Sequence, residues 1–427
     1  MERIVDLSHK VLSLFLNGIY RHLFRSIIFR EYFYILVLNM NYSDRILNTP
    51  SSFVREILKV LGDPEIISFA GGLPNPISFP IPAMQEAIDG AIQKYGSKLF
   101  QYSTTEGLVP LKETIAARYK SRFGLDFSPD DILLTAGSQQ GLDLIGKVML
   151  NKGDQVLIEE PGYLGAIQAL SLTEPEFLAV PLENDGIDVG KLEDTLKKNK
   201  VKVMYTVPNF QNPTGLTYSL EKRQAVCEVL AKYDVLLIED DPYGELRFRG
   251  ESLPYIGAGY LDEQSVLMGS FSKTVTPGMR LGYIVTKNRE LMRYLVTAKQ
   301  GSDLHTSIFV QYAINEYLIN NSYEDHIKKI VDLYGHQASC MLAAMDEYFP
   351  KNVSYTRPEG GMFMWVTMEK GRSAMELFNK AMEKKVAFVP GNPFYVGTPD
   401  VNTFRLNYTN ATEEIIREGI KRLGSCL

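Results

Sequence analysis

The chain of 427 residues has few cysteines, no excess of basic residues and no long uncharged apolar run. Its three cysteines, Cys227, Cys340 and Cys426, lie far apart and form no CxxC pair, which indicates neither a zinc knuckle nor a disulfide framework. We therefore expect a reducing, cytoplasmic location and no metal. The formal net charge is -6, whereas a nucleic-acid surface needs a clustered basic face, so we expect no nucleic-acid partner.

The first 40 residues are rich in Leu, Ile, Phe and Tyr, but charged residues interrupt them. No uncharged stretch approaches the ~18 residues of a membrane span, and no small-residue cleavage site of a signal peptide follows. Two interpretations stay open. The segment is either an amphipathic helix that packs on the protein or lies on a membrane surface, or an extension upstream of a true start at Met40, which we favour. We assign it no catalytic role, and membrane association is not expected.

From about residue 50 the composition is that of a folded protein of two or three domains. Helical patterns at 82–96 and 108–123 precede short apolar runs typical of buried strands, at 131–137, 154–160, 201–207, 234–240, 265–271 and 281–285. Helix-length segments separate most of these runs, and such alternation predicts a mainly parallel sheet with helices on both faces. A further helical stretch around 321–348 is expected to lead to a smaller carboxyl-terminal domain.

Ligands of such sheets bind at the carboxyl ends of the strands. Gly137, Ser138 and Gln139 open a helix after a strand, where free N–H groups favour a phosphate, although a plain helix cap is the alternative. Asp240 ends a strongly apolar strand, so its carboxylate needs a cationic partner. Lys273, within "GSFSKTVTPGMRLGY", lies on a connection between two buried strands; an ordinary surface lysine is the alternative.

A phosphate site, an acid in need of a cation, an arginine and a lysine able to form a Schiff base together complement pyridoxal 5'-phosphate (PLP). From about residue 50 to its end, the chain resembles the fold-type I PLP enzymes of the class I/II aminotransferase family, and is most similar to the 2-aminoadipate and kynurenine aminotransferase branch. The motifs that carry this resemblance occur in the family's order: "SFAGGLP", "QYSTTEGLVPLKETIA", "GSQQGLDL", "QNPTG", "DDPYGEL", "SFSKTVTPGMRLGY" and "FRLNY".

The resemblance implies an α/β fold. A large PLP-binding domain would hold a mainly parallel seven-stranded sheet between helices, and a smaller α+β domain would follow. The expected boundaries are an extension at 1–40, an arm and helix at 41–80, the large domain at 81–325 and the small domain at 326–427. It also implies cis peptide bonds before Pro161 and Pro213.

The resemblance implies a PLP-dependent aminotransferase that moves an amino group between an L-amino acid and a 2-oxo acid such as 2-oxoglutarate. Lys273 would form the Schiff base and carry the proton between the substrate α-carbon and the cofactor. Asp240 would hold the proton on the pyridinium nitrogen. Tyr243 and Asn212 would bond the phenolic oxygen, and Tyr163 would stack on the ring, a core tyrosine being the alternative.

The same resemblance implies contacts to the phosphate from Ser138, Gln139, Ser270, Ser272 and Arg280. Tyr102 would reach the phosphate of a neighbouring subunit, which implies a homodimer with shared active sites. An ordinary surface tyrosine is the alternative at that position.

Substrate contacts are implied as well. Arg405 would clamp the α-carboxylate with its planar guanidinium, Asn212 would assist, and Gly72 would let the backbone approach. Arg55 lies one turn into an expected helix, and we expect it to pair with the distal carboxylate of glutamate or 2-aminoadipate and to swing away for apolar or aromatic side chains. A solvated helix arginine is the alternative.

Other reactions of the same scaffold, such as racemisation, elimination or decarboxylation, share these cofactor contacts. A transcription regulator built on this domain is a weaker alternative, because the first ~50 residues are too short and too apolar for a winged helix.

Overall fold

The computed structural model describes residues 42–49, 65–258, 261–397, 399 and 401–427. The chain divides into residues 1–48 and residues 49–427, each described by itself. In the first part the described helix is α3 (Asp44–Leu47). Arg55 lies outside the described residues, so its expected role is untested. Among the residues that are described, no helix combines the length and the apolar character that crossing a bilayer requires.

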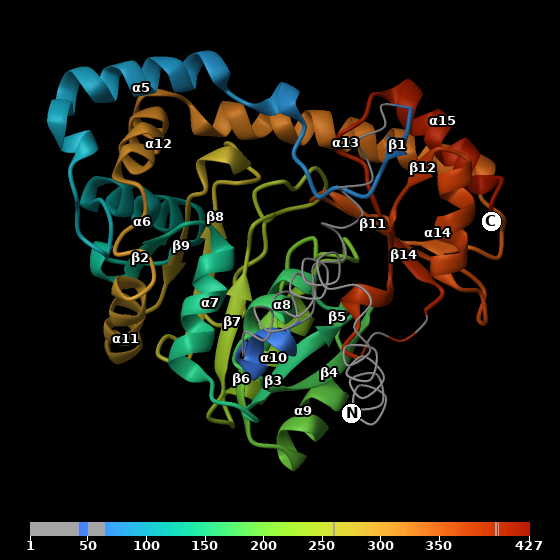
Figure 1. Cartoon of the computed structure of the whole chain (residues 1–427), viewed down its shortest axis with the longest axis horizontal. Coiled ribbons are helices and arrows are strands. Elements are labelled where there is room, and N and C mark those ends of the chain that lie inside the picture. Colours follow the sequence, from blue (N-terminus) through green and yellow to red (C-terminus); the bar gives the residue numbers. More distant parts are fainter. Residues whose placement is uncertain (1–41, 50–64, 259–260, 398, 400) are drawn as a thin grey trace, which may run out of the picture. The chain divides into compact units, whose positions relative to one another are not determined.

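The centre of residues 49–427 is an eight-stranded sheet (Figure 1). Its spatial order is β2 (Ile132–Thr135), β9 (Gly282–Val285), β8 (Ser265–Ser270), β7 (Leu236–Asp240), β6 (Val201–Thr206), β3 (Gln155–Glu160), β4 (Glu176–Glu183) and β5 (Gly186–Ile187). Within the described residues, β9 and β5 run opposite to the other six strands, which are parallel to one another. All six expected strands form. The sheet has one strand more than the seven expected, because the chain after β4 turns back and pairs two residues as β5.

Alternate residues of the buried strands pack on opposite faces of the sheet, which explains why these strands are apolar throughout. Val156 and Ile158 join a core formed with helices α7 (Ser138–Met149), α8 (Leu164–Ser171) and α11 (Arg289–Gln300). Leu157 joins a core formed with α9 (Val189–Lys198) and α10 (Leu220–Leu230). A third cluster joins the sheet to α5 (Ile81–Tyr95), α6 (Val109–Phe123) and α12 (Ile308–Asn320). The sheet is therefore covered on both faces, as predicted.

The carboxyl-terminal part builds a second, antiparallel sheet in the order β10 (Ser354–Tyr355), β11 (Phe363–Thr367), β14 (Thr403–Asn407) and β13 (Val389–Pro390). Helices α13 (Tyr323–Tyr348), α14 (Ala374–Glu383) and α15 (Glu413–Gly424) accompany it, and β1 (Ile67–Ser68) pairs with β12 (Val386–Ala387). The expected helix at 321–348 is thus confirmed as α13. The domain boundaries at 81 and 326 stay predictions.

Candidate active site

Lys273 lies just after β8, on the turn that leads to the short helix η4 (Pro277–Met279). Its Nζ donates a 2.8 Å hydrogen bond to the carbonyl oxygen of Gly72. Burial, together with the positive charges of Arg405 and Arg280, lowers the pKa of Lys273 to about 8. A neutral amine is therefore accessible close to neutral pH, as a nucleophile requires.

Asp240 is the last residue of β7 and is 2% exposed. Its Oδ2 accepts a 2.8 Å hydrogen bond from the hydroxyl of Tyr205, whereas its Oδ1 has no partner among the described residues. Burial raises the pKa of Asp240 to about 7, and the nearby carboxyl groups of Asp241 and Glu159 act in the same sense. The cationic partner expected for Asp240 is not supplied by a described side chain, so the site favours a cationic ligand here.

The amino end of α7 forms one wall of the site. Gly137 has a left-handed φ of 83° and turns the chain into the helix, whose first residue is Ser138. The hydroxyl of Ser138 is buried and has no partner in the described part of the chain, while the side chain of Gln139 donates to the carbonyl of Gly165. Ser270, the last residue of β8, accepts a hydrogen bond at its Oγ from the backbone N–H of Ser272. Free N–H groups at a helix start suit an anion.

Arg280 lies against this helix start. It has a left-handed φ of 51°, a strained conformation for a non-glycine residue. Among the described residues its guanidinium makes long contacts, 3.4 Å to Ser272 Oγ, 3.4 Å to the carbonyl of Pro277 and 3.3 Å to the carbonyl of Ala136. A Cβ atom at Gly137 would lie 2.6 Å from Arg280 Nη2, so glycine is needed there for the guanidinium to come this close. The helix start and Arg280 together form a cationic cradle.

Three further side chains lie between this cradle and the second sheet. Asn212 Nδ2 donates to the hydroxyl of Tyr243 at 3.3 Å. The ring of Tyr163 stacks on that of Tyr205 at 6.5 Å between centroids, and burial raises the pKa of Tyr163 to about 12. Tyr163 comes two residues after the peptide bond Glu160–Pro161, and Asn212 is the first residue of the peptide bond Asn212–Pro213. Both bonds are cis, as expected.

Arg405 comes from β14 of the second sheet and is 3% exposed. It donates to Asn212 Oδ1 at 2.7 Å and to the carbonyl of Ala70 at 2.8 Å, and its Nε has no partner within the described ranges. Its guanidinium lies over the ring of Phe363 at 4.3 Å. Burial lowers the pKa of Arg405 to about 10, which leaves it charged at neutral pH. No described carboxylate pairs with it, so the site favours an anionic ligand.

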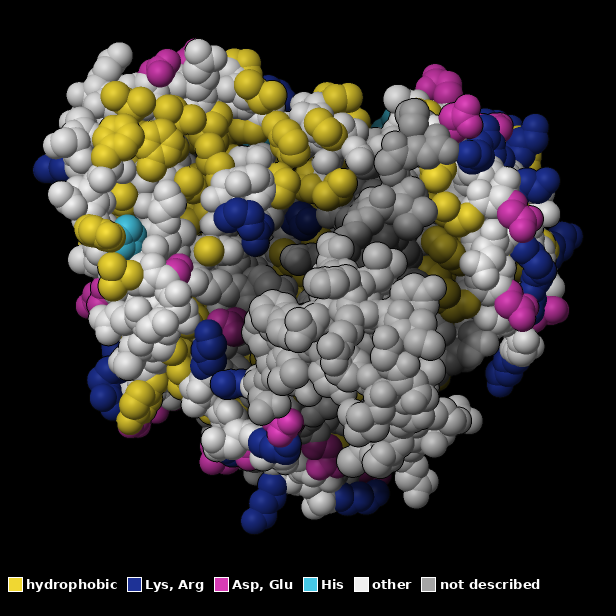
Figure 2. Space-filling model, in the orientation of Figure 1, with side chains coloured by type: hydrophobic (Ala, Val, Ile, Leu, Met, Phe, Trp, Pro, Cys, Tyr) yellow, Lys and Arg dark blue, Asp and Glu magenta, His cyan; other side chains and the backbone are white. Residues whose placement is uncertain are grey.

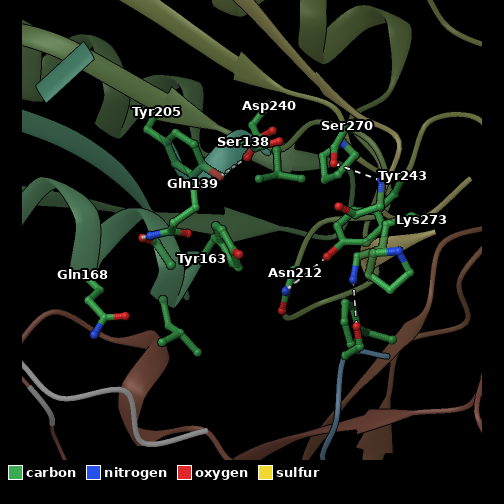
Figure 3. Close-up of a pocket in the computed structure, with 18 of the residues that line it drawn as sticks. Ser138, Gln139, Tyr163, Gln168, Tyr205, Asn212, Asp240, Tyr243, Ser270 and Lys273 are labelled. Carbon is green, nitrogen blue, oxygen red and sulfur yellow. Dashed lines mark hydrogen bonds between the residues drawn. The ribbon is translucent and has the colours of Figure 1, made fainter. Parts of the chain in front are cut away.

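These side chains enclose one cavity of about 470 Å³, and Figure 3 shows the labelled ones arranged around a central space. The predicted residues that line it are Gly72, Ser138, Gln139, Tyr163, Asn212, Asp240, Tyr243, Ser270, Ser272, Lys273, Arg280 and Arg405. Tyr102 does not line the cavity of its own chain; its side chain is 79% exposed and meets the ring of His305 edge-on.

Sequence reasoning missed several lining residues, among them Tyr205, Gln168 and Phe363. Tyr205 carried a usable signal, because a tyrosine within a buried apolar strand needs a partner for its hydroxyl. Nothing in the local sequence singles out Gln168, whose position depends on how α8 packs.

The chain matches the family described as aminotransferase class I and II over residues 74–423, and it belongs to that family. It is 40% identical over 391 residues to aromatic-amino-acid aminotransferase 1 of Thermococcus litoralis. This match covers 90% of this chain and 94% of that protein. It is 42% identical over 382 residues to the 2-aminoadipate transaminase of Thermus thermophilus, with coverages of 88% and 94%. The kynurenine aminotransferase of Pyrococcus horikoshii, solved in complex with PMP, aligns with a TM-score of 0.87, 41% identity and coverages of 90% and 96%.

The fold is therefore that of a fold-type I PLP-dependent transferase. The protein is a PLP-dependent aminotransferase that transfers an amino group to a 2-oxo acid. Three buried polar atoms of the cavity, which no other described residue contacts by a hydrogen bond, fit the cofactor and its substrate: Asp240 Oδ1 suits a pyridinium nitrogen, Ser138 Oγ a phosphate, and Arg405 Nε a carboxylate. The amine of Lys273 in the same cavity suits an aldehyde.

Asp240→Asn should stabilise the cofactor-free protein more at pH 8 than at pH 5. The unfolded carboxyl ionises near pH 4, whereas the folded one keeps its proton until about pH 7, so stability falls as pH rises through this window. Asparagine does not ionise, so it removes this loss in the free energy of unfolding, which reaches at most about 4 kcal/mol above pH 7. Thermal midpoints of both proteins at the two pH values measure it. An equal difference at pH 5 and pH 8 would contradict the raised pKa.

Proposed function

We propose that the chain is an aminotransferase of broad range for 2-aminoadipate, glutamate, aromatic and branched-chain amino acids, with 2-oxoglutarate as an acceptor. Arg405 carries this proposal. It is buried, charged and without a carboxylate partner among the described residues, and it lies where it can bind the α-carboxylate common to all these substrates. Gly72 and Asn212 lie beside it: Asn212 accepts from its guanidinium, and the Gly72 carbonyl holds Lys273.

Bound PLP supplies an electron-withdrawing ring that stabilises negative charge at the substrate α-carbon. In this role assignment Lys273 Nζ would bind the cofactor aldehyde and, once substrate has displaced it, would carry the proton between the substrate α-carbon and the cofactor. Its lowered pKa suits both tasks, because a base works best with a pKa near the working pH. Asp240 Oδ1 holds the proton of the ring nitrogen, and Tyr205 fixes its other oxygen.

The remaining side chains position the cofactor. Tyr163 stacks on the ring, and Asn212 with Tyr243 bonds the phenolic oxygen. The amino end of α7, with Ser138 and Gln139, holds the phosphate from one side. The hydroxyls of Ser270 and Ser272 and the guanidinium of Arg280, which line the same end of the cavity, complete the phosphate site. Burial of these groups around the ligand excludes water and strengthens each charged hydrogen bond.

The proposed substrate range rests on the relatives and on the cavity wall. The relatives are named for aromatic amino acids, 2-aminoadipate and kynurenine. Leu164, Val207 and Phe363 give the cavity apolar surface, and Gln168 gives it an amide. The wall therefore suits both apolar and polar side chains. Pairing of Arg55 with a distal carboxylate stays a prediction about a residue outside the described part of the chain.

A substrate panel tests this range. We expect measurable kcat/KM for 2-aminoadipate, glutamate, leucine and kynurenine with 2-oxoglutarate as acceptor. In Arg55→Ala, acidic substrates should lose about 2 kcal/mol of transition-state binding while leucine and kynurenine lose far less. Activity with one substrate class alone would contradict the broad range, and an equal loss across all four would assign Arg55 to helix stability.

We also propose a homodimer in which Tyr102 reaches the phosphate site of the partner subunit. Apolar side chains gather over α5 in Figure 2, and Ile77, Ile81, Phe100 and Tyr102 are at least 66% exposed around that helix. Exposed apolar surface of this extent is typical of an interface.

Location in the cytoplasm and the absence of a nucleic-acid partner stay predictions from composition.

Mixing Tyr102→Ala with Lys273→Ala subunits tests the shared site. Tyr102→Ala should bind PLP about 10- to 100-fold more weakly, the value of one hydrogen bond to a charged group, and Lys273→Ala should be inactive. A mixed dimer has one site with both residues, so at limiting PLP the mixture should be more active than either parent. No recovery in dimers that have demonstrably exchanged subunits would place Tyr102 outside the site.

A further inference from the structure

A cluster of three potential metal ligands lies on the carboxyl-terminal helices, away from the residues that line the active-site cavity. His336 and Cys340 occupy positions i and i+4 of α13, so they share one face of that helix. Glu413 is the first residue of α15, which packs on α13 (Figure 1). One ligand atom from each residue lies within 4.8 Å of the other two.

Two of the three distances within this cluster match those around one tetrahedral ion, and the third, between the sulfur of Cys340 and a carboxylate oxygen of Glu413, is within 4.8 Å. His336 Nε2 lies 3.5 Å from Cys340 Sγ and 3.4 Å from Glu413 Oε2. With zinc bond lengths of about 2.3 Å to sulfur and 2.1 Å to nitrogen and oxygen, tetrahedral angles set S and N about 3.6 Å apart and N and O about 3.4 Å apart. The imidazole nitrogen therefore already lies at tetrahedral spacing from both other ligand atoms.

The ligand types also suit zinc. A thiol, an imidazole and a carboxylate together are a borderline-soft set, whereas Ca²⁺ and Mg²⁺ prefer oxygen alone. Cys340 is half-buried at the edge of the hydrophobic core, which restricts its position, while His336 and Glu413 are exposed and leave an approach from solvent. The cation one turn along α15 from Glu413 is Arg417, and its guanidinium pairs with the carboxylate of Glu347.

We propose that His336, Cys340 and Glu413 bind one Zn²⁺, with water as the fourth ligand. Binding converts the Cys340 thiol to a thiolate and releases its proton to water. The ion would join α13 to α15, so its role is structural, and amino transfer at moderate temperature should not depend on it. This departs from the sequence analysis, which predicted no metal from the absence of a CxxC pair. The sequence pattern does not indicate the cluster, because its ligands come from two distant segments.

Calorimetric titration of the PLP-loaded protein with Zn²⁺ tests the proposal. We expect one Zn²⁺ per chain at this site, a higher thermal midpoint with Zn²⁺, and no such rise with Mg²⁺ or Ca²⁺. Cys340→Ser, His336→Gln and Glu413→Gln should each weaken binding at least tenfold. Cys426→Ser is the matched control: it removes another half-buried thiol and should leave binding unchanged.

A second measurement guards against a variant that fails to fold. Co²⁺ in place of Zn²⁺ should give a thiolate-to-metal charge-transfer band, which should vanish in Cys340→Ser and persist in Cys426→Ser. Absence of this band in the unaltered protein, or Zn²⁺ binding of equal strength in Cys340→Ser and the unaltered protein, would overturn the proposal. Neither result bears on the proposed substrate range.

Discussion

Replacing Lys273 with alanine is expected to abolish amino transfer while the protein keeps its fold. A positioned acid–base group contributes about 10²- to 10⁴-fold to rate, and Lys273 would serve as both nucleophile and proton carrier. Its Nζ makes one hydrogen bond, to the Gly72 carbonyl, and is held in a site that disfavours its charge. Removing it should therefore leave the thermal midpoint of the cofactor-free protein unchanged or raised. Turnover and thermal midpoint are measured together.

Lys273→Arg is the matched control for charge. Arginine keeps a cation of similar reach but is not deprotonated near neutral pH, so it should be as inactive as alanine. Activity above a few per cent in either variant would refute the assignment of Lys273. Loss of activity accompanied by unfolding would show only that the lysine supports the structure.

Arg405→Gln is expected to weaken binding of every amino acid and every 2-oxo acid alike. Truncating one partner of a buried charge pair costs about 2–5 kcal/mol, which corresponds to about 30- to 4,000-fold in kcat/KM. All these substrates share the α-carboxylate, so the loss should not depend on the side chain. Kinetics with glutamate, leucine and 2-oxoglutarate measure it.

Two observations separate this role from a structural one. Without substrate Arg405 is a buried cation with no described carboxylate beside it, so Arg405→Gln should not destabilise the cofactor-free protein. Arg417→Gln, which removes an arginine that is 53% exposed, should leave the kinetics unchanged. A loss confined to acidic substrates would instead assign Arg405 to the side-chain end of the cavity.

The sequence predicted the sheet and much of the cavity because both depend on local pattern. Uninterrupted apolar runs mark strands buried on both faces, and the residues that follow them meet at one edge of the sheet. Asp240 and Lys273 could be singled out for this reason. The roles of Arg405 and Gly72 came from the family resemblance, since the first lies on the second sheet and the second in the segment after β1.

The residues that were missed depend on packing between distant segments. Tyr205 reaches Asp240 because β6 pairs with β7 in a particular register, which the strand's own residues do not specify. Gln139 itself was predicted, but the hydrogen bond from its side chain to the Gly165 carbonyl was not, because this contact is set by how α7 meets α8. The ligand cluster of His336, Cys340 and Glu413 likewise exists only because α15 returns to α13.

The half-reaction with amino acid alone tests most directly whether this cavity transfers amino groups. The PLP-loaded protein is mixed with glutamate or 2-aminoadipate in the absence of a 2-oxo acid, and products are counted per active site. We predict one equivalent of the 2-oxo acid, one equivalent of cofactor in its pyridoxamine form, and restoration of PLP when 2-oxoglutarate is added. Release of carbon dioxide or ammonia, or formation of the D-amino acid without aminated cofactor, would contradict amino transfer and assign the same residues to another PLP reaction.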